Sequence, residues 1–216
     1  MRRRCALVLT AAWPAWAVAA PSGLIAAAEA GDVAALRRLL DDGAAVDARD
    51  PRQRTALLAA TQANRVDAAR LLIERGADVN AKDEIQDSPF LYAGAEGRLE
   101  ILRLTLAAGA DLKSTNRYGG TALIPAAHHG HVATVRELLK TQIDVDHINR
   151  LGWTALLEAI ILGDGGVAHT EIVRLLVAHG ANVNLADAQG VGPLAHAEQR
   201  RQAPISDMLR HAGARR

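Results

Sequence analysis

The segment Thr154–Leu157 reads TALL and belongs to a set of related tetrads that return at a fixed interval. The other three members are Thr55–Leu58 (TALL), Ser88–Leu91 (SPFL) and Thr121–Ile124 (TALI), and the steps between successive tetrads are equal. A fixed period of about 33 residues is the signature of a repeat architecture, in which each repeat is one supersecondary unit. The sequence therefore predicts a stack of similar units.

A second series of five-residue segments keeps the same interval and closes each unit. Its members are Gly43–Asp47, Gly76–Asn80, Gly109–Lys113, Gln142–Asp146 and Gly180–Asn184. The last of these members begins later than the period predicts, at Gly180 instead of position 175. One unit therefore carries five extra residues, near residues 162–167.

The residues between the two series predict two short helices in each unit. The Thr or Ser of each tetrad is expected to cap the first helix, because its side-chain oxygen can accept a free amide of the first turn. The second helix, such as residues 132–140, has apolar residues at helical spacing. Gly76, Gly109 and Gly180 then stand where a left-handed C-cap favours glycine, whereas Gln142 takes this place in the fourth unit.

The tetrads and closing segments resemble the ankyrin repeat, whose T-P-L-H-x-A opening and G-A-D-V-N close they match, with Leu or Ile in place of the His. The resemblance covers residues 22–216 and implies an all-α fold, an ankyrin-repeat α-solenoid of helix-turn-helix units with finger-like turns. Such a solenoid has a concave side. The expected repeats span residues 22–50, 51–83, 84–116, 117–149, 150–187 and 188–216, and the first and last are degenerate.

The N-terminal residues 1–19 read as a secretory signal peptide. Three arginines follow Met1, an apolar run extends from Cys5 to Val18, and small residues precede Pro21. The alternative is a retained N-terminal anchor. Cleavage would leave 22 basic and 24 acidic residues and no cysteine, a composition suited to an oxidising compartment. We expect a periplasmic protein, or alternatively a secreted one.

Composition and motifs argue against several classes of function. The near balance of 25 basic and 24 acidic residues disfavours a nucleic-acid or acidic-membrane binder held by net charge. The sequence holds no G-x-S-x-G, H-E-x-x-H or dinucleotide-binding glycine motif. We therefore expect a non-catalytic protein without a cofactor, not bound to the membrane after cleavage, and monomeric.

Positions that vary between the repeats are candidates for recognition, because stacking fixes the others. The resemblance implies that one face of each first helix and the preceding finger line the concave groove. Three aromatic residues fall there, and we expect Tyr92, Tyr118 and Trp153 to anchor a partner, although packing on a neighbouring finger is the alternative. The candidate partner-binding residues are Tyr92, Glu96, Arg117, Tyr118, His128, His129, Arg150, Leu151, Trp153, Glu158, Ile161 and Leu162.

The three histidines at positions 128, 129 and 131 raise the question of a metal site. His128 and His129 are adjacent in the sequence and cannot converge as i,i+4 ligands would, and no cysteine or nearby carboxylate completes a tetrahedral set. We expect no metal here, and a groove contact that could respond to pH instead.

These observations predict a non-catalytic protein–protein interaction module of the bacterial periplasm. The chain resembles periplasmic ankyrin proteins of Gram-negative bacteria, some of which are associated with haem catalases and tolerance of peroxide. The resemblance alone implies an accessory role toward a periplasmic enzyme such as catalase. The alternatives are a secreted effector that binds host proteins, and an enzyme or metal carrier that uses His128 and His129.

Overall fold

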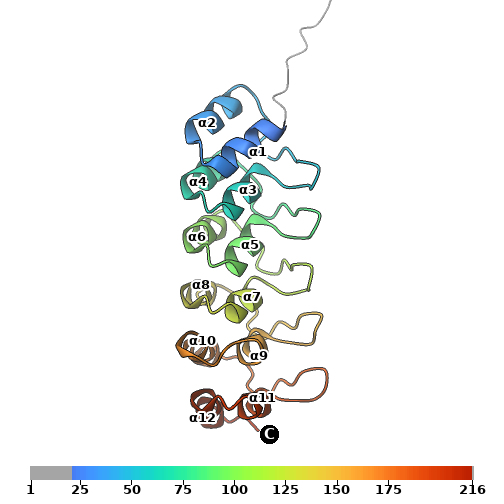
Figure 1. Ribbon diagram of the computed structural model, residues 1–216, viewed down its shortest axis with the longest axis vertical. Helices are drawn as coiled ribbons and strands as arrows, with labels where there is room; N and C mark the ends of the chain where they lie inside the picture. Colours follow the sequence, from blue (N-terminus) through green and yellow to red (C-terminus); the bar gives the residue numbers. More distant parts are fainter. Residues whose placement is uncertain (1–20, 216) are drawn as a thin grey trace, which may run out of the picture.

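The computed structural model describes residues 21–215, and the predicted signal peptide, residues 1–19, lies outside them. The described chain is all-helical: twelve helices and no strand, as expected. The helices pair into six successive units that stack into an elongated solenoid (Figure 1). Neighbouring first helices contact each other, and so do neighbouring second helices, so each unit is held mainly by the units on either side.

The first helices of the units form the middle column of Figure 1, the second helices form an outer column, and the loops project on the opposite side. The first helices are α1 (Pro21–Ala30), α3 (Ala56–Gln62), α5 (Pro89–Ala95), α7 (Leu123–His128), α9 (Ala155–Ile161) and α11 (Pro193–Gln199). The second helices are α2 (Val33–Asp41), α4 (Val66–Glu74), α6 (Leu99–Ala107), α8 (Val132–Leu138), α10 (Val167–Ala178) and α12 (Ala203–His211).

The core is built from small and branched side chains, as the scarcity of aromatic residues requires. Leu57, Leu123 and Leu156, at the third position of their tetrads, are at most 1% exposed. Phe90 takes the same position in the third unit and is fully buried. The first helices can therefore approach one another closely, and the stack shares one continuous apolar core.

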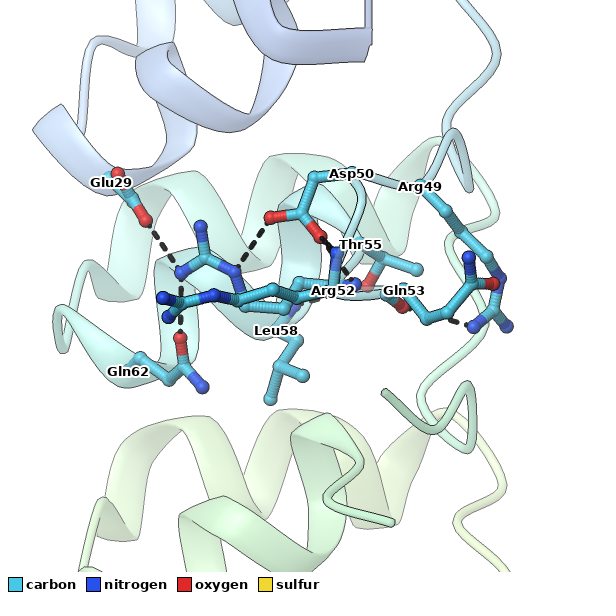
Figure 2. Close-up of polar contacts among 9 residues, drawn as sticks. Glu29, Arg49, Asp50, Arg52, Gln53, Thr55, Leu58 and Gln62 are labelled. Carbon is cyan, nitrogen blue, oxygen red and sulfur yellow. Dashed lines mark hydrogen bonds and ion pairs between the residues drawn. The ribbon is translucent and has the colours of Figure 1, made fainter. Parts of the chain in front are cut away.

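Each finger, the loop between successive units, is shaped by one Asp or Asn side chain. In the finger before α3, Asp50 Oδ1 accepts hydrogen bonds from the backbone amides of Arg52 and Arg54, both at 2.9 Å (Figure 2). The third residue after this side chain has a left-handed backbone, and it is Gln53 (φ 61°) in this finger but Gly119 (φ 74°) in the finger before α7. The same double acceptance is made by Asp83, Asn116, Asn149 and Asp187.

The predicted N-caps form in three of the four tetrads. The side-chain oxygens of Thr55, Ser88 and Thr154 each accept the amide three residues on, at 3.2 Å. In the fourth unit the prediction was wrong, because α7 begins only at Leu123 and its N-cap position is Ala122. The Thr121 hydroxyl is buried there without a hydrogen-bond partner.

The ends of the second helices follow the glycine pattern. Gly76, Gly109 and Gly180 have φ angles of 84°, 87° and 85°, the left-handed values expected of a C-cap. The fourth unit has Gln142 instead, and α8 ends at Leu138, two residues before the predicted end at residue 140. At seven residues, α8 is the shortest second helix among the described residues.

The five extra residues of the fifth unit are shared between a loop and a helix. Five residues separate α9 from α10, against three between α3 and α4, and α10 has twelve residues where α4 has nine. The extra turn is held in place by His169, whose ring contacts the Asp164 carboxylate and the His128 carbonyl, each at 2.8 Å. The insertion is therefore a packed part of the stack.

A ladder of side chains joins the closing segments of neighbouring units. Asp47 accepts the backbone amide of Asp78 at 3.0 Å, and Asn80 accepts that of Asp111 at 2.8 Å. Asp146 and Asn184 repeat the contact further along the chain. The third unit has Lys113 at this position, which has no acceptor atom, so the ladder is interrupted between the third and fourth units.

Candidate functional site

A cavity of about 450 Å³ opens between the fingers and first helices of the third, fourth and fifth units. We call it the central cavity. Three of its lining residues come from α5 and the residue that follows it: Tyr92, Ala95 and Glu96. Others come from α7, α9 and the fingers before them. The walls thus combine apolar side chains with carboxylates.

Nine of the twelve candidate partner-binding residues line the central cavity. Those on or directly after the helices are Tyr92, Glu96, His128, His129, Glu158 and Leu162. Those on the fingers are Arg117, Tyr118 and Leu151. The structure therefore brings most of the candidates from three separate units to one place.

The other three candidates do not line the central cavity. The Arg150 guanidinium donates a hydrogen bond to the Arg117 carbonyl at 2.7 Å and so braces two neighbouring fingers. Trp153 is half-buried beside the cap of α9. Ile161 is half-buried at the end of α9, and its carbonyl accepts a hydrogen bond from Arg200.

Seven lining residues are absent from the candidates, and the repeat period itself distinguished two of them. Asn116 and Asn149 occupy equivalent positions in successive repeats and shape their fingers, so the period already set them apart. The other five are Asp87, Ala95, Gly120, Ile124 and Pro125, and three of these also had a signal, because Ala95 and Pro125 hold groove-face positions of their helices and Asp87 a finger position.

Glu158 is the most buried ionisable group of the central cavity. The residue is 7% exposed, and its Oε1 atom accepts a hydrogen bond from Asn149 Nδ2 at 2.7 Å. Its Oε2 atom accepts no hydrogen bond from the described residues, and His128 Nδ1 lies 3.8 Å away, beyond hydrogen-bonding distance. Burial raises the pKa of Glu158 above its ordinary value, opposed by the Asn149 hydrogen bond and the nearby His129.

The two cavity histidines differ in what holds them. His129 Nδ1 donates a hydrogen bond to the Ala95 carbonyl at 2.7 Å, which ties α7 to α5. Burial, together with the neighbouring His129 and His169, lowers the pKa of His128. Among residues 21–215, no group of three or more His, Cys, Asp or Glu residues is arranged to hold a metal ion.

At the finger edge of the central cavity, a cation is already paired. The Arg117 guanidinium lies 3.3 Å from an Asp87 carboxylate oxygen and 5.0 Å above the Tyr118 ring. Burial raises the pKa of Asp87 despite the opposing charge of Arg117. Tyr118 itself is 56% exposed, so the ring offers its surface to solvent at the rim.

Nearer the N-terminus, in the second unit, the Arg54 side chain lies among polar groups of the first helices and the finger. Arg54 Nε contacts Asp50 Oδ2 at 2.8 Å, and Arg54 Nη1 contacts Glu29 Oε1 at 2.8 Å and Gln62 Oε1 at 3.2 Å. In Figure 2 these contacts are among the dashed lines, and they end at Glu29, Asp50 and Gln62. We call these four residues the arginine clamp.

The comparison with family models identifies the repeat. The model described as "Ankyrin repeats (3 copies)" matches residues 18–83 and 90–187. Among the described residues, no helix is both long and apolar enough to cross a membrane.

Solved structures with the same architecture match nearly the whole chain. An ankyrin repeat domain from Acinetobacter baumannii AYE is 58% identical with a TM-score of 0.87, over 89% of this chain and 98% of that chain. The ankyrin repeat protein EF0377 is 40% identical with a TM-score of 0.85, over 90% of this chain and 98% of that chain. The ankyrin repeat domain of Bcl-3, a member of the IkappaB family, is 28% identical with a TM-score of 0.80, over 89% of this chain and 86% of that chain.

A curated relative matches over a much shorter part of the chain. The putative ankyrin repeat protein YahD of Escherichia coli (strain K12) is 46% identical over 57 residues, which are 26% of this chain. The match spans 28% of the length of YahD.

Proposed function

The chain belongs to the ankyrin-repeat family, and from this premise we propose that it binds a protein partner in the concave groove, at the central cavity. Ankyrin repeats generally mediate protein–protein interaction and are typically non-catalytic. We propose the same for this chain.

The observation that carries the proposal is the exposure of large apolar side chains around a cavity that also holds a buried carboxylate. Tyr118, Leu151 and Leu162 are 56%, 53% and 44% exposed and line the cavity together. Exposed apolar side chains that gather beside a concavity are typical of an interaction site. Aromatic residues at such a site often contribute most of the binding energy.

The test is a crosslinked capture of partners from the exported protein fraction, with variants that separate the cavity from its surroundings. The double variant Tyr118→Ala, Leu151→Ala changes only exposed cavity residues, so its fold should persist. Ile148→Ala is the matched control, because Ile148 is 49% exposed and does not line the cavity. We expect the double variant to reduce capture about tenfold or more and the control to leave it within about twofold. Equal loss in both would refute the cavity as the binding site.

We propose that binding takes place in the periplasm, after cleavage of residues 1–19. The basic, apolar and small-residue segments of this stretch support the proposal. Fractionation of cells that express the full chain, followed by mass measurement of the product, tests it. Retention of the intact N-terminus in the cytoplasmic fraction would refute it.

We further propose that the partner is itself an exported protein, with a periplasmic enzyme such as catalase as the first to test. Only the resemblance noted in the sequence supports this identity. The crosslinked proteins that depend on Tyr118 and Leu151 will name the partner directly, and a set without catalase would refute the catalase assignment.

A further inference from the structure

The chemistry of the central cavity fits one kind of side chain. We propose that it binds an arginine side chain of the partner, with the guanidinium group seated on the Oε2 atom of Glu158. The inference rests on the proposed function, which it makes more specific. Three features of the structure carry it: an incompletely bonded buried carboxylate, an excess of carboxylates over cations, and the arginine clamp elsewhere in the same groove.

The first feature is the unsatisfied half of Glu158. Asn149 satisfies Oε1, whereas Oε2 accepts no hydrogen bond from the described residues and belongs to a side chain that is 9% exposed and lines the cavity. A buried carboxylate normally has partners for its oxygens, because the loss of hydration is costly. A charged donor that enters the cavity would supply the missing partner.

The second feature is the balance of charge around the cavity. Three carboxylates line it, from Asp87, Glu96 and Glu158, and Arg117 is paired with Asp87. Glu96 is exposed and forms no ion pair with the described residues. The other titratable groups of the lining are His128 at the end of α7, His129 directly after it, Tyr92 on α5 and Tyr118 on a finger. Burial lowers the pKa of His128. The lining therefore holds three carboxyl groups against one guanidinium group, and when ionised these carboxylates outnumber the cation.

The third feature is the arginine clamp, which shows that this groove can hold a guanidinium group. Arg54 is the residue just before the capping Thr55, and its guanidinium contacts Asp50, Glu29 and Gln62 (Figure 2). The corresponding positions before the tetrads of the next three units are Asp87, Gly120 and Trp153. The chain therefore supplies no guanidinium of its own from these positions, and a partner can.

The residues that line the cavity favour a long side chain with a flat cationic end. Pro125, Leu151 and Leu162 offer apolar contacts for the methylene groups of arginine. The rings of Tyr92 and Tyr118 line the same cavity, and aromatic faces attract guanidinium groups.

The test uses a small probe, Nα-acetyl-arginine amide, and its uncharged analogue Nα-acetyl-citrulline amide. Both are titrated into the chain that begins at residue 20, while backbone and side-chain amide signals are followed by NMR. We expect saturable shifts at the Asn149 side-chain amide, Leu151 and Glu158 with the arginine probe, and about tenfold weaker binding of the citrulline probe. Equal binding of the two probes, or shifts outside the cavity, would overturn the proposal.

Two variants complete the test. Glu158→Gln removes the charge but can still accept the Asn149 hydrogen bond, and we expect it to weaken the arginine probe about tenfold. Glu100→Gln is the matched control, because Glu100 pairs with Arg103 on α6 and is no part of the cavity. Unchanged binding to Glu158→Gln, in a variant whose amide spectrum shows a native fold, would overturn the proposal.

The two proposals can fail separately. If partner capture depends on Tyr118 and Leu151 but the arginine probe does not distinguish Glu158→Gln from the wild type, the interaction site stands and the arginine assignment falls. If the probe binds at Glu158 but no captured protein depends on Tyr118 and Leu151, the guanidinium site stands and the proposed function falls.

Discussion

Two regions of the face formed by the first helices and the fingers differ, although both are built on the same repeat: a side chain occupies the region in the second unit, whereas a cavity opens in the third to fifth units. In the second unit, Arg54 fills the space between Glu29, Asp50 and Gln62. In the third to fifth units, Glu158 and the surrounding side chains leave a cavity of about 450 Å³. The residue just before each tetrad differs between the two regions: it is Arg54 in the second unit, and Asp87, Gly120 and Trp153 in the next three.

The comparison separates the positions that build the stack from those that set the groove. The finger side chains Asp50 and Asn149 both accept two amides of their own loop, so the scaffold is the same at both ends. Their remaining atoms differ: Asp50 accepts from Arg54, whereas Asn149 donates to Glu158. In these two fingers the choice of Asp or Asn thus matches the charge of the side chain that it contacts.

The largest expected effect comes from breaking that match. Asn149→Asp keeps the two finger acceptances, as Asp50 and Asp187 do, but sets two carboxylates against each other. We expect a loss of about 3 kcal/mol in the free energy of unfolding at pH 7, because a buried acceptor loses its donor and gains a like charge. Urea denaturation measures it.

The sixth unit provides the rescue for this variant. There His196 Nε2 donates to Asp187 Oδ2 at 2.7 Å, at the position equivalent to Glu158. The double variant Asn149→Asp, Glu158→His should therefore recover most of the lost stability. A double variant no more stable than Asn149→Asp would show that the match of charge is not the cause.

An intermediate effect is expected from removing the guanidinium of the arginine clamp. Arg54→Ala should cost about 2 kcal/mol, less than for a fully buried pair, because 22% of the Arg54 side chain is exposed. Arg117→Ala, with 45% of its side chain exposed, should cost less than about 1 kcal/mol. Parallel urea titrations would contradict the comparison if the two losses were equal.

The pH dependence of the Arg54→Ala loss gives an internal check. Burial favours the neutral form of Asp50, but hydrogen bonds from the Arg54 and Arg52 amides and the Arg54 guanidinium hold the pKa of Asp50 below its ordinary value. Its contribution to stability is therefore present near neutral pH and disappears as the pH falls through this lowered pKa. The difference between wild type and variant should shrink over the same acidic range.

The smallest expected effect is a gain at the interrupted ladder, between the third and fourth units. Lys113→Asn would restore the acceptor that Asn80 and Asn184 provide elsewhere. We expect a gain of about 1 kcal/mol in the free energy of unfolding, typical of one added hydrogen bond. Lys113→Ala is the control for loss of the lysine, and an equal gain in both variants would contradict the role of the acceptor.

Much of the fold could be predicted from the sequence because stacking repeats the same local chemistry in every unit. The caps at Thr55, Ser88 and Thr154 and the left-handed glycines followed directly from the period. The late start of α7 did not, because Thr121 belongs to a regular tetrad and its failure to cap depends on how the unit packs.

The candidate site could be predicted only in part. The period placed Tyr92, His128 and Glu158 on one face, and all three line the central cavity. Trp153 looked equivalent to Tyr118 as a variable finger aromatic, but only Tyr118 lines the cavity. Which side chains leave a cavity and which fill it depends on contacts between units, as the Arg54 clamp shows, and the spacing of one unit does not contain that information.

The interrupted ladder at Lys113 has a thermodynamic consequence for any ligand of the central cavity. A stack of repeats behaves as a one-dimensional chain of coupled units, and its weakest coupling determines which part opens first. The cavity draws its walls from both sides of this junction, from Tyr92 on α5 and from His128 and Glu158 on α7 and α9. A bound partner would therefore act as an external coupling between the two halves, and its binding free energy would suppress amide hydrogen exchange in the units beyond the junction.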